Sequence, residues 1–201
     1  MKALPPGATV VELGPGAAHV ARLSGRSDLR WLGIESSLDC LPALSGILSG
    51  GVLADLEAQP RLPRCDAVLS GDTLEHMNDP EGMLRRIQEA LPSGGLLLIS
   101  VPNVANAYVR LNLLFGRFPY ADRGILDRTH RYFFTRASLR RMLEAHGFEV
   151  QRGAVSTIPL PLALPGLPGP LLALLTGALS VATRLLPKLL GFQLLFVARK
   201  K

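Results

Sequence analysis

Small and acidic residues follow four short apolar runs in the first part of the chain. The runs lead into Glu12-Leu13-Gly14-Pro15-Gly16, Glu35-Ser36, Asp55-Leu56 and Ser70-Gly71-Asp72. Parallel strands present their carboxyl ends at one edge of a sheet, and open α/β sheets bind ligands at that edge. These four segments are therefore expected to line a single cleft.

The residue types in this cleft suit a nucleoside ligand. The turn from Gly14 to Gly16 has no side chain to obstruct a close ligand, and the amides of the following helix point at the same space. Glu35, 19 residues beyond Gly16, can accept hydrogen bonds from both hydroxyls of a ribose. Asp55 is placed to accept from the exocyclic amine of a purine. Taken singly, each is also typical of a tight turn, a helix cap or a loop, so the prediction rests on their joint spacing.

The glycine turn distinguishes two classes of nucleotide-binding protein. A dinucleotide fingerprint would need a small residue at position 19, where the chain has His19, which argues against a nicotinamide-dependent oxidoreductase. Glu12-x-Gly14-x-Gly16-x-Ala18 instead resembles the first motif of class I S-adenosylmethionine-dependent methyltransferases, although that family usually has glycine at the last position. Further blocks are similar to the same family: Leu74-Glu75-His76 before Asp79-Pro80, Leu91-Pro-Ser-Gly-Gly95, and Val101-Pro-Asn103.

The resemblance implies a fold, a cofactor and a set of binding residues. The fold is an α/β Rossmann-like three-layer sandwich with a seven-stranded, mostly parallel sheet whose last strand is antiparallel. The cofactor is S-adenosyl-L-methionine. Its amino-acid part would lie against Glu12, Gly14 and Gly16, with Ser70, Gly71 and His76 closing the pocket on that side. Its ribose would lie at Glu35 and Ser36, and its adenine near Asp55 and Leu56.

Residues 126–134 and the helix that follows are similar to a bacterial subgroup often found beside glycosyltransferases. This predicts O-methylation of a small molecule, a sugar or a lipid-linked glycan. The alternative is a catalytically weak or inactive partner protein of a biosynthetic enzyme, similar to the MetW type.

Methyl transfer to a hydroxyl group requires loss of its proton, and a histidine suits that step. We predict His130 as the base and Asp127 as its orienting partner, with a structural loop network as the alternative. His76 is expected to pack under the cofactor, while His19 and His146 are expected to be structural. No metal ligands are assigned.

The net charge of +6 is unevenly distributed: residues 1–109 sum to −4, whereas residues 110–152 and 153–201 each sum to +5. The basic part suggests an anionic acceptor, or else a solvated face. Nucleic acid is not expected, because no recognisable RNA-binding module is present. The arginines of the acceptor side are Arg110, Arg117, Arg123, Arg128 and Arg131.

Strands are predicted at 8–13, 31–34, 51–54, 66–70, 95–101, from 148 and at 193–198, with helices beginning at Asp79-Pro80 and Thr135. Residues 1–201 are expected to form one domain with an apolar insertion at 156–191. Residues 153–183 carry no charge and five prolines, which predicts a buried or lid-forming helix, or one lying on a membrane or partner surface, rather than a membrane span. Two reduced cysteines, Cys40 and Cys65, and the lack of a signal peptide predict a cytoplasmic protein, with membrane association as an option.

Overall fold

The structure is a computed structural model that describes residues 3–201. Seven strands form one sheet in the order β3-β2-β1-β4-β5-β7-β6. β7 runs antiparallel to both of its neighbours, and the other paired strands are parallel. This is the predicted Rossmann-like fold. The strands are β1 (Thr9–Leu13), β2 (Arg30–Glu35), β3 (Gly50–Leu53), β4 (Ala67–Gly71), β5 (Leu96–Pro102), β6 (Phe148–Val155) and β7 (Gln193–Lys200).

The strands form where apolar, β-branched residues are concentrated, and each begins within two residues of its predicted position. Val10 and Val11, whose side chains point to opposite faces of β1, are both fully buried. A strand buried on both faces needs helices on both sides, which explains why its sequence is continuously apolar rather than alternating.

The helices and short 3₁₀ turns connect the strands. α3 begins where Asp79 accepts a hydrogen bond from Gly82 N at 2.7 Å and Pro80 occupies the first turn. α5 begins with a capping box between Thr135 and Ser138, so both predicted helix starts are confirmed. The elements are α1 (His19–Ser24), η1 (Leu38–Cys40), α2 (Leu41–Leu44), η2 (Leu56–Ala58), η3 (Leu74–His76), α3 (Pro80–Ala90), α4 (Ala107–Leu114), α5 (Arg136–Ala145), α6 (Leu160–Ala163), α7 (Gly169–Leu185) and α8 (Pro187–Leu190).

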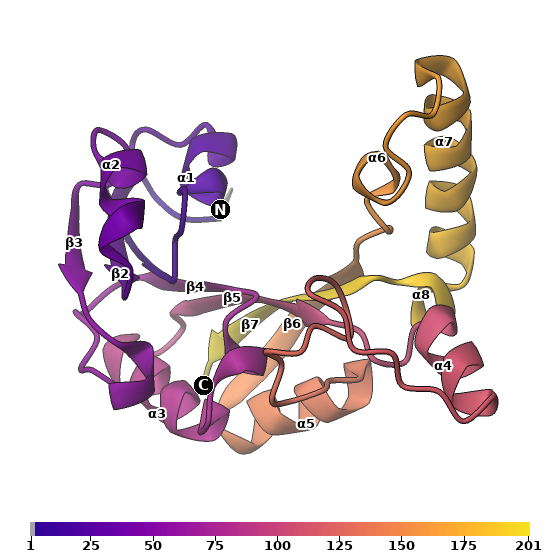
Figure 1. Ribbon diagram of the computed structural model, residues 1–201. Helices are drawn as coiled ribbons and strands as arrows, with labels where there is room; N and C mark the ends of the chain where they lie inside the picture. Colours follow the sequence, from indigo (N-terminus) through magenta and orange to yellow (C-terminus); the bar gives the residue numbers. More distant parts are fainter. Residues whose placement is uncertain (1–2) are drawn as a thin grey trace.

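Helices flank the sheet on two sides (Figure 1). α1 and α2 lie on one face, whereas α3 and α5 lie on the other, where the larger apolar core is packed. The strand order reverses between β1 and β4, because the chain returns from β3 to pair with the far side of β1. Ligands of doubly wound sheets bind at such a switch point.

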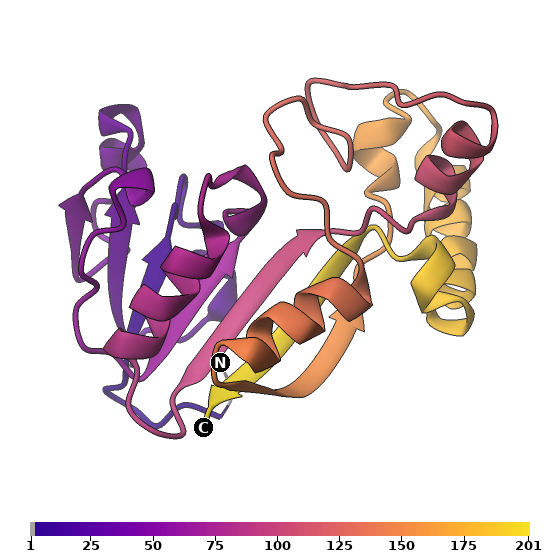
Figure 2. The same cartoon turned by 90° about the horizontal axis from the view of Figure 1, so that it is seen from below.

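The uncharged insertion forms α6, α7 and α8 between β6 and β7, and α7 stands away from the sheet (Figures 1 and 2). The prediction of a buried helix is wrong: Thr183 is the one residue of α7 that is buried, and leucines such as Leu174 and Leu185 are 68% and 76% exposed. The less exposed face of α7 carries the polar residues Thr176, Ser180 and Thr183, whereas its leucines are turned largely to solvent. Among the described residues, no helix is long and apolar enough to span a membrane.

Candidate active site

The turn after β1 is open to a ligand. Gly14 and Gly16 have φ angles of 60° and 52°, a region that favours glycine, and a Cβ atom built on Gly16 would meet nothing within 4 Å. Ala18 also lies in the left-handed region with φ 52°, at a conformational cost of roughly 1–2 kcal/mol. This is the position where the family pattern usually has glycine, which explains that preference.

Two buried polar groups at this turn lack a partner. Glu12 is 5% exposed, and its Oε2 accepts no hydrogen bond from any described residue. Burial raises the pKa of Glu12 to about 7. Ser70, which pairs with Leu13 across the sheet, is fully buried and its hydroxyl likewise has no described partner. Buried polar groups normally find partners, so this edge is suited to a ligand that carries a cationic amine.

Glu35 fastens the ends of β1 and β2 together. Its Oε2 accepts from Gly16 N at 3.0 Å, and its Oε1 accepts from Ser36 N at 2.8 Å and Ser37 N at 3.0 Å. The side chain is 8% exposed and lines a cavity of about 340 Å³ between β2, β3 and α2. The carboxylate therefore already holds the glycine turn in place beside the point where we predict ribose binding.

The third and fourth strand ends lie in the same row. Leu13 pairs with Ile34 and with Ser70, and Glu35 pairs with Leu53, which directly precedes the Asp55 loop. Asp55 is exposed and caps η2 by accepting from Glu57 N, while Leu56 is half-buried against the core. Ser36 and Gly71 are exposed at this edge. The structure thus brings the predicted cleft residues together; their contacts with a cofactor remain predictions.

His76 and His130 meet beyond the end of β4, with ring centroids 4.7 Å apart. His130 Nδ1 lies 3.1 Å from the carbonyl oxygen of Ile125. Because a carbonyl oxygen only accepts, the neutral His130 ring carries its proton on Nδ1 and a lone pair on Nε2. A lone pair on Nε2 is what a general base at this position requires.

Asp127 does not orient His130 in the predicted way, since Ile125 makes that contact instead. The Oδ1 atom of Asp127 accepts from Thr129 N at 2.8 Å and Thr129 Oγ1 at 2.6 Å. Thr129 Oγ1 in turn lies 3.0 Å from His76 Nδ1. Asp127 caps its own loop, so its carboxylate reaches the His76 ring only through the hydroxyl group of Thr129.

Sequence reasoning missed Glu75, although the Leu74-Glu75-His76 block pointed to it. Its side chain is fully buried, and neither carboxylate oxygen has a hydrogen-bond partner among the described residues. Burial, reinforced by the nearby Asp72 carboxylate, raises the pKa of Glu75 to about 8. Its backbone oxygen accepts from Arg131 N and Tyr132 N at 2.8 and 3.1 Å, which anchors the loop carrying His130 beside η3.

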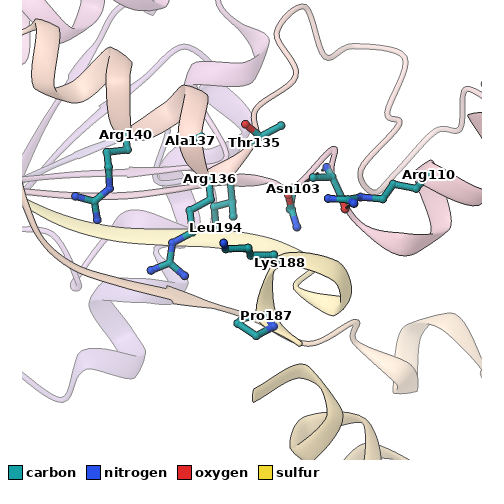
Figure 3. Close-up of a pocket in the computed structure, with 10 residues that line it drawn as sticks. Asn103, Arg110, Thr135, Arg136, Ala137, Arg140, Pro187, Lys188 and Leu194 are labelled. Atoms are coloured by element: carbon teal, nitrogen blue, oxygen red, sulfur yellow. Dashed lines mark hydrogen bonds between the residues drawn. The ribbon is translucent and has the colours of Figure 1, made fainter. Parts of the chain in front are cut away.

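A second cavity, of about 410 Å³, lies between the start of α5, β7, α4 and α8 (Figure 3). Arg136 and Lys188 point toward the same space, and the guanidinium groups of Arg136 and Arg140 lie 6.0 and 5.9 Å from the centroid of the Phe196 ring. Arg110 lines the opposite side, and none of the described residues that line the cavity is acidic. The arrangement suits a phosphate or carboxylate group.

The five arginines predicted to cluster are separated in the structure. Arg128 pairs with Asp122 at 2.8 Å, and Arg131 donates to Asn78. Arg110 alone of the five lines the cationic cavity. Arg136, Arg140 and Lys188, which sequence analysis did not single out, supply the other cations, because the fold brings α5 and α8 together from distant parts of the chain.

The strand order with an antiparallel β7 defines a class I S-adenosylmethionine-dependent methyltransferase fold. The sequence agrees: residues 1–152 match the family described as methyltransferase domain, and the chain belongs to that family. α6, α7, α8 and β7 lie beyond the matched residues. None of the curated proteins matches the chain in sequence.

Solved structures share the fold at low sequence identity. A SAM-dependent methyltransferase from Archaeoglobus fulgidus superposes with a TM-score of 0.63 at 16% identity, covering 96% of this chain and 86% of that one. An S-adenosylmethionine-dependent methyltransferase from Mesorhizobium loti gives 0.64 at 18% identity, with coverage of 98% and 94%. Magnesium protoporphyrin IX methyltransferase from Synechocystis, with bound SAH, gives 0.64 at 15% identity, with coverage of 98% and 75%.

The protein is a methyltransferase with S-adenosyl-L-methionine as its cofactor, and its residues fit that group. The open turn at Gly16 leaves room for the backbone to approach a ligand, and Glu12 Oε2, which has no partner among the described residues, suits an amine. The cofactor supplies a methyl group on a positively charged sulfur, so the protein's own task is to hold an acceptor in line and to remove a proton.

Proposed function

We propose that the protein transfers a methyl group to a hydroxyl oxygen of a small-molecule, sugar or lipid-linked glycan acceptor. The observation that supports this most directly is the fixed tautomer of His130. Its Nδ1–H is held by Ile125, so Nε2 is free to accept the hydroxyl proton as the oxygen forms its bond to carbon. The segment that carries His130 is anchored on η3, next to the predicted cofactor cleft.

The acceptor in this proposal carries an anionic group. Four positive side chains line the 410 Å³ cavity, and none of the described residues that line it is acidic. Guanidinium groups stacked on Phe196 lose less conformational entropy when they bind an oxyanion. A sugar phosphate or a lipid-linked diphosphate has the required charge.

The apolar surface of α7 suits an acceptor that resides in a membrane. We propose that residues 1–201 act as one methyltransferase domain in which the 156–191 insertion contacts the membrane surface. Residues 153–201 include five basic and no acidic side chains, and exposed leucines such as Leu174 and Leu185 extend along α7. α7 itself carries one basic residue, Arg184, and Lys188 follows on α8, so the exposed leucines lie beside positive charge that attracts anionic lipids.

The test is a transfer assay with methyl-labelled S-adenosylmethionine. Sugars, sugar phosphates and polyprenyl-diphosphate-linked sugars are compared as acceptors, and the methylated atom is assigned by NMR. We expect O-methyl products from the anionic acceptors. Arg136→Gln is expected to raise the acceptor KM at least about tenfold with little change in kcat, because a charge-assisted contact made in both ground and transition states is lost.

Arg152→Gln, an exposed arginine outside the cavity, is the matched control. Transfer to nitrogen or carbon only, or equal transfer to neutral and anionic sugars, would refute the proposal.

A further inference from the structure

Glu75, His76 and His130 converge at one corner of the site. Each offers one ligand atom, and these three atoms lie within 4.8 Å of one another. Two imidazoles and one carboxylate form a donor set that suits divalent first-row metals with mixed nitrogen and oxygen ligation. We propose that this corner binds one divalent transition-metal ion, of which Zn²⁺, Mn²⁺ and Fe²⁺ are the chemical candidates.

The burial of Glu75 separates this cluster from an ordinary group of surface residues. The side chain is 0% exposed, and both of its oxygens lack a partner among the described residues. An ionised carboxylate in such surroundings is strongly destabilising unless a cation compensates it. The carboxylate of Asp72, which lies near, is occupied: it accepts from Ser100 Oγ and Gln193 Nε2. A metal ion between Glu75 and the two imidazoles would give the buried carboxylate oxygens the partner that they lack among the described residues.

Hydrogen bonds to Thr129 and Ile125 already orient both histidines for this role. Thr129 gives its hydroxyl proton to Asp127, so its oxygen accepts from Nδ1–H of His76. Ile125 O accepts from Nδ1–H of His130. In both neutral rings Nε2 then holds the lone pair. Metal-binding histidines characteristically donate their other N–H to a carbonyl, a carboxylate or a bridging group in this way.

Three protein ligands leave coordination positions open, as in catalytic metal sites. For this step the inference rests on the proposed function: an acceptor hydroxyl bound at an open position would have a lowered pKa and would release its proton to solvent. In this arrangement Nε2 of His130 is a metal ligand. The metal ion, rather than the His130 imidazole acting as a base, then promotes loss of the proton from the acceptor hydroxyl.

Metal binding is tested on the full chain without a histidine tag, after dialysis against a chelator. ZnCl₂, MnCl₂ and CoCl₂ are added separately, bound metal is measured by mass spectrometry, and Co²⁺ is also followed by its visible absorption. We expect about one ion per chain, with a Co²⁺ spectrum typical of mixed nitrogen and oxygen ligands. Glu75→Gln and His130→Gln are each expected to weaken binding by at least about tenfold.

His19→Gln is the matched control, because His19 is an exposed histidine on α1 outside the cluster. Thermal melts show whether the buried Glu75→Gln variant is folded, and His130→Gln supplies an independent answer if it is not. No stoichiometric binding, or binding that both variants retain, would overturn the inference. O-methyl transfer by the metal-free protein would support the proposed function and remove the catalytic role of the ion. Metal binding without O-methyl transfer would support the metal site and refute the proposed function.

Discussion

The predicted cofactor side and the proposed acceptor side of this methyltransferase are built differently. On the cofactor side, Glu35 ties Gly16 to the end of β2 through three backbone amide contacts, so the turn is fixed before any ligand arrives. On the acceptor side, residues 103–134 form a long loop with α4, and α7 stands in solvent with most of its side chains exposed. The ends of strands position the residues of the predicted cofactor side, whereas loops and an insertion position those of the proposed acceptor side.

This difference indicates which function each side serves. A cofactor has one shape, and a rigid site costs the least entropy when it binds. The acceptor is what changes between methyltransferases, and loops accommodate such change without disturbing the sheet. Substitutions on the cofactor side should therefore act on affinity, and substitutions on the acceptor side on turnover or membrane attachment.

The largest effect is expected for Glu35→Ala. The change removes the acceptor of three amides as well as the predicted ribose contact, so calorimetry should show S-adenosylhomocysteine binding weakened by about a hundredfold or more. Asp39→Ala, an exposed carboxylate on η1, should bind normally. Unchanged affinity in Glu35→Ala would remove the ribose assignment.

His130→Ala should lower turnover by at least about tenfold, because proton removal from the acceptor is impaired. Affinity for S-adenosylhomocysteine should stay close to that of the unmodified protein, which would separate the two sides of the site. His19→Ala is the control for loss of an imidazole. Full turnover in the His130 variant would reassign the base.

The pKa of Glu12 makes stability depend on pH. Burial raises its pKa from 4.5 to about 7, so in this interval the folded chain binds a proton that the unfolded chain has lost. The free energy of unfolding should therefore fall as pH rises from about 5 to 8, and Glu12→Gln should remove Glu12's share, about 1–3 kcal/mol. Denaturant melts at each pH measure this, and added S-adenosylmethionine should reduce the fall. A pH profile identical in both proteins would contradict the assignment.

The smallest effect is expected at α7. Replacing Leu174 and Leu185 with glutamate should weaken binding to anionic phospholipid vesicles by about tenfold in a flotation assay, because apolar burial and attraction to the lipid are both reduced. Leu23→Glu on α1, where the leucine is 86% exposed and so more exposed than either α7 leucine, controls for added charge. Soluble S-adenosylhomocysteine binding should not change. Equal flotation of all three proteins would discard the membrane contact.

The sequence predicted the sheet and the positions of its strand ends well, because the signals that form them are local. Val10 and Val11 form a strand because they are β-branched and apolar, and Asp79 and Thr135 begin helices because their side chains cap the first turn. Each of these signals is contained within a few residues. Glu12 lies near the end of β1, and Gly14 and Gly16 come directly after it, so the sequence alone predicts where they lie.

The acceptor side depends on contacts between distant segments, which the sequence does not encode locally. Nothing near Glu75 shows that both of its oxygens are buried without a partner, since His130 approaches from a loop 55 residues further on. Arg136 and Lys188 share a cavity because β7 draws α8 toward α5. Spacing predicts a contact between Asp127 and His130, but the local loop geometry directs the Asp127 carboxylate to Thr129.

The placement of β7 has a consequence for synthesis of the protein. β7 lies between β5 and β6, although β6 and the whole α6–α8 excursion precede it in the chain. While the chain is still growing, β5 has an open edge and β6 has no neighbour to pair with. Such an edge invites pairing with other nascent chains. A chain that lacks residues 193–200 should therefore hold five paired strands, β3-β2-β1-β4-β5, with β5 exposed at the edge, and β6 joins the sheet only through β7.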